Sequence, residues 1–281
     1  MKHVQLNDLE FSLPGNWNEL STGQLLVLAN MLLRDNMTVE EIKIKMLFTA
    51  MEAHVTNHTR EGRYTLVFRK SKLNLSAADV LAMASVFDFL FEENANGVMV
   101  LRSKLTKNPF PILPCKCSTR LVGPEEGLAD LTYEQAIEAE SFLQKFSKSK
   151  NPSDYHRFVS ALHRTGGHFD IDKLEANAKL VAHASPAQLH LVYLFWCGCM
   201  ERMAHLYPNC FSGAKESETS PKKPFELHRD IIYKLSGGDI TKETTIEKLE
   251  LHRVYHVLNT KIEEDEKARA EYERLKQKHK R

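Results

Sequence analysis

The chain has 281 residues, and 42% of them are hydrophobic, which is ordinary for a globular protein and sufficient for one large core or two smaller ones. Its 38 lysine and arginine residues nearly balance 37 aspartate and glutamate residues, so the formal net charge of +1 argues against a dedicated nucleic-acid binder. The first residues lack the apolar core of a signal peptide, and no run of about 18 uncharged apolar residues follows, so we expect a cytoplasmic protein that does not bind membranes.

The first predicted elements are a short extended segment and a pair of helices. Residues 1–18 alternate weakly between apolar and polar types before Pro14-Gly15, which predicts a strand or an extended arm that ends in a turn. Ser21 and Thr38 are each followed three residues later by Gln or Glu, the spacing of a capping box, and each precedes an apolar stripe at helical spacing. We therefore predict a helical hairpin over residues 21–53.

A small β element and a third helix are predicted next. Residues 64–68 are rich in β-prone types, and together with residues 73–75 they favour a small hairpin. Ser76 is a suitable N-cap for a helix whose apolar face continues to Phe91. Residues 98–101 favour one further strand.

Residues 105–146 are the most distinctive part of the chain. Pro109, Pro111 and Pro114 exclude a helix there and favour an extended segment. A glycine-flanked acidic turn, GPEEG, follows, and Thr132 then begins a helix with another capping box. We expect this segment to be a structural crossover that joins two halves of a helical scaffold.

Three more helices should follow the crossover. Asn151-Pro152 begins a helix that we expect to end at Gly166-Gly167, and a shorter helix should run from Leu174 to about residue 182. Ser185 caps the most hydrophobic helix of the chain, which is apolar nearly all round over residues 189–200. This run is too short to cross a bilayer, so we interpret it as the central core helix.

The last part of the chain has a different composition. Residues 212–223 are small, polar and charged, which is typical of a linker. A helix that ends at Gly237-Gly238 should follow, and then a long charged helix with a break near residues 249–251. Its last residues predict either a solvated helix or a partner-binding tail.

These elements predict a mainly α protein of eight or nine helices with one small β-hairpin element. We expect a multi-helix, bundle-like body and a smaller C-terminal helical unit. The predicted divisions are an N-terminal helical part with the β element, a central part with the crossover and the core helix, a linker, and a C-terminal unit with a charged tail. Their ranges are residues 1–104, 105–211, 212–223 and 224–281.

Two pairs of cysteines raise the question of a metal site. Cys115 and Cys117, with Cys197 and Cys199, offer four thiolates to a tetrahedral zinc. On a helix, however, Cys197 and Cys199 point about 200° apart and do not face one ion. We therefore predict no metal and no cofactor, and Cys115 and Cys117 are the remaining candidates for metal ligands.

Two other groups of polar residues have both a catalytic and a structural interpretation. His252 and His256 share a helix face, but no neighbouring carboxylate supplies the base of an H-E-x-x-H motif, so we predict surface histidines. Glu134, Glu138 and Glu140 lie opposite an apolar stripe, which is what the solvated face of a surface helix requires. We predict no catalytic residue.

Five segments resemble, in the same order, a family of helical proteins from phages and prophages of Bacteroidota. Proteins of this family are encoded among tail genes and are regarded as tail assembly chaperone-like. The Cys115 and Cys117 pair departs from the family pattern, which argues further against a shared metal site. The matching segments are LPGNWNELSTGQLLVLANMLL, LTKNPFPIL, LVGPEEGLADLTYEQAIEAESF, FWCGCMERMAHLYPNCF and FELHRDIIYKLSGGDITKETT.

The resemblance implies a non-enzymatic protein of the bacterial host cytoplasm that binds a tail component, such as the tape measure protein. A structural tail or baseplate component that stays in the particle is the alternative. An enzyme, the third class, requires a cluster of perturbed ionisable groups that the sequence does not indicate. We expect the protein partner to bind apolar residues of the C-terminal unit, namely Phe225, Ile231, Leu235, Leu251, Val254, Leu258 and Ile262.

Overall fold

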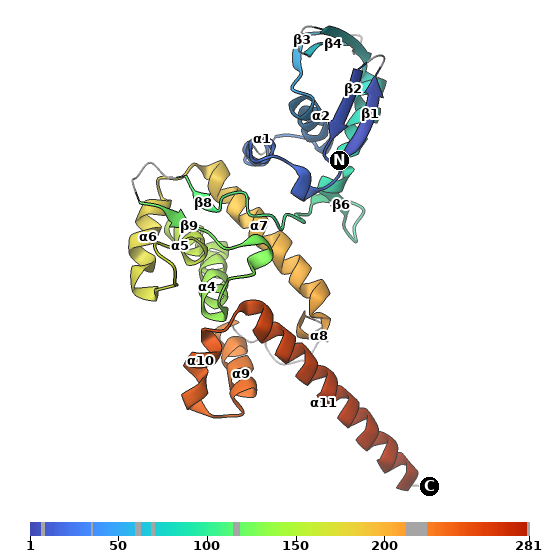
Figure 1. Ribbon diagram of the computed structural model, residues 1–281. Helices are drawn as coiled ribbons and strands as arrows, with labels where there is room; N and C mark the ends of the chain where they lie inside the picture. The colour runs from blue at the N-terminus through green and yellow to red at the C-terminus, as the bar shows by residue number, and fades with distance from the viewer. Residues whose placement is uncertain are drawn as a thin grey trace. The chain divides into compact units, whose positions relative to one another are not determined.

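A computed structural model describes residues 1–6, 9–34, 36–59, 63–68, 71–114, 119–211 and 224–279, with backbone only for residues 6, 9, 58 and 224–227. Across these residues the chain forms eleven α-helices, several short 3-10 helices and four small antiparallel sheets (Figure 1). The predicted mainly α class is confirmed, with more β structure than the single element expected.

Contacts within the chain define two compact units. Unit 1 comprises residues 1–109 and 185–198, and unit 2 comprises residues 110–184 and 199–281. The contacts thus group the C-terminal helices with residues 110–184, whereas the predicted divisions separate them. The predicted linker, residues 212–223, lies outside the described residues.

Unit 1 begins with a β-hairpin. Strands β1 (Lys2–Leu6) and β2 (Leu9–Leu13) pair in antiparallel register, so the N-terminal segment is a hairpin rather than a single strand or arm. A 3-10 turn (Trp17–Glu19) follows, and Trp17 is buried. The turn leads directly into the first helix.

The predicted helical hairpin is confirmed. Helices α1 (Thr22–Leu32) and α2 (Val39–Ala50) are in contact with each other, and each begins with a complete capping box. The hydroxyls of Ser21 and Thr38 each accept a hydrogen bond at 3.2 Å, from the backbone amides of Gln24 and Glu41 respectively. These bonds satisfy amides that a helix leaves unpaired at its start, which is why the short motif located both helices.

A three-stranded sheet follows α2. Strands β4 (Arg63–Phe68) and β5 (Ser71–Ser76) form the predicted hairpin, and β3 (His54–His58) adds an edge strand that its polar sequence does not indicate. Helix α3 (Ala77–Ala84) is capped by Ser76 as predicted.

The predicted continuation of α3 to Phe91 is wrong. The chain changes to a 3-10 helix (Ser85–Leu90), and Phe91 begins strand β6 (Phe91–Glu93), which pairs with β7 (Met99–Leu101). At the change of helix type the Ser85 hydroxyl donates to the Ala82 carbonyl at 2.6 Å, a local bond of a kind that competes with regular helix.

Unit 2 begins in the proline-rich segment and contains three consecutive helices. Short strands β8 (Ile112–Leu113) and β9 (Leu121–Val122) pair, and α4 (Tyr133–Ser149), α5 (Pro152–Leu162) and α6 (Leu174–Val181) follow, with the predicted caps at Thr132 and Asn151. Helix α5 ends at Leu162, earlier than predicted. Arg164 instead exchanges two backbone hydrogen bonds with Val122, at 2.8 and 2.9 Å.

Helix α7 (Pro186–Leu206) is the predicted core helix, and its contacts assign its first part to unit 1 and the remainder to unit 2. The Ser185 hydroxyl caps it by accepting from the Gln188 amide at 3.3 Å. No helix among the described residues is long and apolar enough to cross a membrane. The buried apolar side chains of α7 include Leu191, Val192, Leu194, Phe195 and Met203.

The C-terminal part of unit 2 consists of α8 (Pro208–Phe211), α9 (Pro224–Ser236), α10 (Glu243–Glu247) and α11 (Leu251–His279). The predicted break before α11 is confirmed. Two backbone hydrogen bonds join the break to the start of α4. Tyr133 N donates to Leu249 O and Leu251 N donates to Leu131 O, each at 2.8 Å. Beyond residue 262 every described side chain of α11 is exposed.

Candidate functional site

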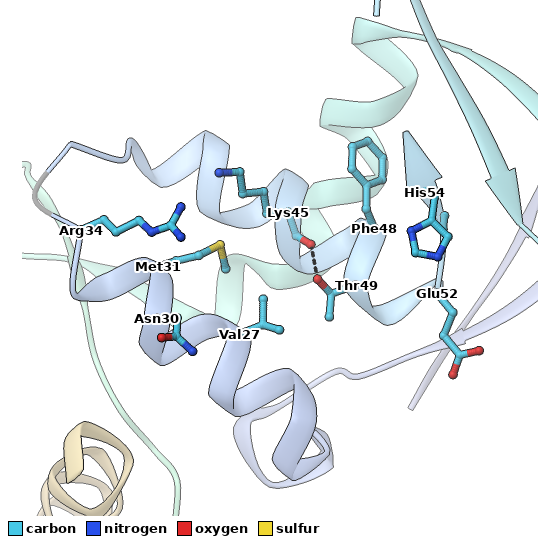
Figure 2. Close-up of a pocket in the computed structure, with 10 residues that line it drawn as sticks. Val27, Asn30, Met31, Arg34, Lys45, Phe48, Thr49, Glu52 and His54 are labelled. Atoms are coloured by element: carbon cyan, nitrogen blue, oxygen red, sulfur yellow. Dashed lines mark hydrogen bonds between the residues drawn. The ribbon is translucent and has the colours of Figure 1, made fainter. Parts of the chain in front are cut away.

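Unit 1 contains a groove between α1, α2 and the start of β3, with a volume of about 710 Å³ (Figure 2). This volume lies within the range of about 300–1,000 Å³ that is typical of ligand-binding clefts. The groove is partly open to solvent. Its lining residues are Val27, Asn30, Met31, Arg34, Lys45, Phe48, Thr49, Glu52, Ala53 and His54.

The floor of the groove is apolar. Met31 and Phe48 are 4% and 8% exposed, so both side chains belong to the core of unit 1 and show only their outer surface. Val27 is 37% exposed and stands beside them on α1. Val27 lies outside the buried residues of α1, so this helix carries one partly exposed apolar side chain beside the buried Met31.

The far wall is formed by the turn that ends α2. Ala53 N donates to Phe48 O at 2.9 Å and Glu52 N donates to Thr49 O at 3.2 Å, which is the hydrogen-bond pattern of a Schellman motif. Glu52 occupies the left-handed position of this motif with φ of 52°, a conformation that glycine normally supplies. The turn therefore holds the entry to β3 in one geometry.

The charges of the groove are unevenly placed. Arg34 follows the end of α1, Lys45 lies on α2, and Figure 2 shows both side chains extending toward one another at one end of the groove. Glu52 and His54 lie at the other end. Arg34 and Lys45 are exposed, and neither forms an ion pair with a residue that the structure describes. One end of the groove is therefore cationic.

The remaining polar groups of the lining are already bonded within their own helices. Asn30 Nδ2 donates to Leu26 O at 2.8 Å, and Thr49 Oγ1 donates to Lys45 O at 2.7 Å. The lining therefore presents apolar surface and the charged or polar side chains of Arg34, Lys45, Glu52 and His54.

Most of the predicted partner-binding residues lie elsewhere, and three of them are not available at the surface. Leu251, Val254 and Leu258 are at most 4% exposed, because the first turns of α11 pack into the core of unit 2. The helical stripe was recognised correctly, but it faces the protein itself. These three side chains stabilise unit 2.

The other predicted partner-binding residues have mixed positions. Ile231 and Leu235 on α9 and Ile262 on α11 are half-buried, so part of each side chain is accessible. The side chain of Phe225 lies outside the described residues. Ile231 and Leu235 lie on one short helix of unit 2, whereas the groove residues belong to unit 1.

The cysteines do not form a metal centre among the residues described. Cys115 and Cys117 lie outside them, and within them no three His, Cys, Asp or Glu side chains are close enough to hold an ion. Cys199 is buried, and Cys197 and Cys210 are half-buried thiols.

The prediction of two surface histidines is wrong for one of them. His252 is half-buried, with Nδ1 at 3.1 Å from the Tyr207 hydroxyl and Nε2 at 2.9 Å from the Gly127 carbonyl oxygen. It therefore ties α11 to the turn before α4. His256 is exposed, as predicted.

The three glutamates of α4 are likewise less solvated than predicted. Glu134 and Glu138 are half-buried, and this burial raises the pKa of both carboxyls above its ordinary value. Glu140 Oε2 lies 3.3 Å from Nε2 of His228, whose Nδ1 lies 2.9 Å from the buried hydroxyl of Tyr133. This chain of polar groups fastens α9 to α4, so its role is structural.

A buried network around Arg164 also escaped sequence analysis. Its guanidinium donates to Gln135 Oε1 at 3.2 Å and to Asp130 Oδ2 at 2.9 Å, which joins the end of α5 to the start of α4. The neighbouring His163 is fully buried with Nε2 at 3.1 Å from the Phe110 carbonyl oxygen, and burial lowers its pKa to about 4. These groups hold the crossover segment in place.

Comparison of the chain with protein-family models, with curated proteins and with solved structures found no match in any of the three. The groove of unit 1 combines a partly exposed apolar side chain, a ligand-sized volume and two cations that form no ion pair with a described residue. The sequence signal that would have located it is the surplus of apolar residues on the first helix, LLVLANMLL, which exceeds one face.

Proposed function

We propose that the protein is a tail assembly chaperone or adaptor of a phage or prophage, which binds an apolar segment of a tail component, such as the tape measure protein, without catalysing a reaction. It would act in the cytoplasm of the bacterial host. The tail assignment rests on the resemblance of its five segments to the chaperone-like family. The groove of unit 1 supplies a physical means of binding.

The observation that carries this proposal is a groove with an apolar floor, in which Val27 is partly exposed, between helices that pack on the core of unit 1. Both walls are capped helices that pack on the core, and the turn at Glu52 is held by two backbone hydrogen bonds. A site that is already formed loses little conformational entropy when a partner binds. A groove between helices is a common receptor for a partner's amphipathic helix.

Such a groove suits the task of a chaperone. Apolar segments of a long tail protein aggregate when they are exposed before assembly. Covering one apolar stripe at a time, in an open groove that also allows release, would delay that aggregation until polymerisation begins. This role requires a surface and no active site.

The test is co-expression of the protein with the tape measure protein of the same phage or prophage, followed by measurement of solubility and co-purification. Val27→Asp places a charge on the groove floor at a side chain that is 37% exposed, so the fold should tolerate it. Leu81→Asp is the matched control, because Leu81 is 48% exposed on α3 and does not line the groove. Val27→Asp should abolish capture, and Leu81→Asp should retain it.

Equal capture by both variants would show that the groove is not the binding site. Mass spectrometry of purified virions separates the proposal from the alternative of a structural component. A chaperone should be absent from mature particles, whereas a tail or baseplate component should be present in them at a fixed ratio.

A further inference from the structure

The chemistry of the groove restricts the conformation of what it can bind. The groove meets only the first residue of β3, and the backbone groups of α1 and α2 are used within the helices. Asn30 and Thr49, which line the groove, donate to carbonyls of their own helices. A bound segment therefore gains no backbone hydrogen bonds from these helices, and a helix is the conformation that satisfies its own within a single segment.

The charges restrict its composition as well. Arg34 and Lys45 extend toward one another beside Met31, so a partner lying on the apolar floor meets two cations at that end. Lys45 Nζ has a described contact only with Met37 Sδ, at 3.8 Å, which does not neutralise it. A carboxylate on the partner would complement both charges, and a lysine or arginine there would be repelled.

We infer that the groove selects an amphipathic helix whose apolar face is followed, at one end, by an aspartate or glutamate that sits between Arg34 and Lys45. This inference rests on the proposed function and specifies the chemistry of its partner. The apolar anchors at i, i+3 or i+4, and i+7 give affinity on the floor formed by Val27, Met31 and Phe48. The carboxylate gives the direction in which the helix lies.

The test uses three designed helical peptides with the same leucine stripe, which differ only in carrying Glu, Gln or Lys at the position next to its end. Binding to the full-length protein is measured by fluorescence anisotropy. The Glu peptide should bind best and the Lys peptide worst. The preference should shrink between about 0.1 M and 1 M salt, because the Debye length falls from about 10 Å to about 3 Å.

The second part of the experiment reverses the two charges on the protein. Arg34→Glu with Lys45→Glu should weaken binding of the Glu peptide roughly tenfold and improve binding of the Lys peptide, since exposed ion pairs are exchanged for like-charge contacts. The matched control is Lys72→Glu with Lys107→Glu, which reverses two exposed cations of unit 1 outside the groove and should leave the peptide preference unchanged.

The outcomes separate this inference from the proposed function. Equal binding of the three peptides, or an equal effect of the two double variants, would overturn the selection for a carboxylate. Neither result would affect the capture of the tape measure protein. If none of the peptides binds, while Val27→Asp still abolishes capture of the tape measure protein, the inference that the partner is a helix would be overturned. If the unaltered protein does not capture the tape measure protein, the proposed function would instead be refuted.

Discussion

Among the described glycines of unit 1, Gly198 in α7 is the one at which an added methyl group meets backbone atoms most closely. A Cβ atom there would lie 2.4 Å from the carbonyl oxygen and 2.5 Å from the amide nitrogen of Leu105, whereas an ordinary contact begins at 3.4 Å. The crossover segment must therefore move by about 1 Å, and it has little freedom to do so. Asn18 Oδ1 accepts from the amides of Thr106 and Lys107, each at 2.9 Å, and the Ser103 hydroxyl donates to Leu194 O at 2.7 Å.

Two opposing terms decide the size of the effect of Gly198→Ala. Overpacking against backbone costs up to about 3 kcal/mol, and the higher helix propensity of alanine returns about 1 kcal/mol, so we expect a net loss of about 2 kcal/mol. Chemical unfolding monitored by tryptophan fluorescence measures it, because Trp17 and Trp196 both lie in unit 1. In thermal unfolding the transition of unit 1 should fall by roughly 5–10 °C.

A second helical glycine provides the control. At Gly23 in α1 the nearest atom to an added Cβ is Ser21 Oγ at 3.9 Å, so Gly23→Ala should be neutral or stabilise the protein by up to about 1 kcal/mol. The two substitutions are chemically identical and should differ in sign. If Gly198→Ala unfolds at the same denaturant concentration as the unaltered protein, the close approach of Leu105 to α7 is wrong.

Three further predictions concern unit 2. Phe110→Ala removes a side chain that is 5% exposed and should destabilise the protein by about 3–5 kcal/mol in urea unfolding; an unchanged midpoint would contradict its place in the core. His228→Ala leaves the buried Tyr133 hydroxyl without its described partner and should cost about 1–3 kcal/mol, with faster hydrogen exchange in α9; exchange that is unchanged would show that the bond to Tyr133 does not hold this helix. The pKa of His163 is lowered to about 4 in the folded protein, so the unfolded chain binds a proton more readily between pH 6.5 and 4. The free energy of unfolding should therefore be highest above pH 6.5 and fall by up to about 3 kcal/mol as the pH falls toward 4. His163→Gln should flatten the pH dependence of the urea midpoint in that window, and an unaltered slope would refute the assignment.

Helix starts were predictable because their chemistry is local. At Ser21, Thr38, Ser76 and Thr132 the capping residue and its partner lie within four positions, and all four capping boxes are present in the structure. Helix ends were less predictable. The end of α5 at Leu162 depends on a backbone pairing with Val122, which lies far away in the sequence.

The candidate site was not predictable in the same way. Leu251 of the C-terminal helix and Val27 of α1 are both apolar residues of helical segments, yet Leu251 is buried and Val27 is exposed. Which apolar side chains are covered depends on the elements that pack against them. The same reason explains the glutamates of α4, since Glu134 and Glu138 lose part of their solvation to tertiary neighbours.

The sequence by itself determined the fold class, most helix starts and the crossover character of the proline-rich segment, because propensity, capping and the missing amide of proline act within a few residues. Only the tertiary structure decided which apolar side chains remain exposed, which ionisable groups are buried, and that Arg34 and Lys45 line the same groove. These properties depend on contacts between distant parts of the chain, and no local pattern encodes them. The groove of unit 1, the proposed means of binding, depends on such contacts.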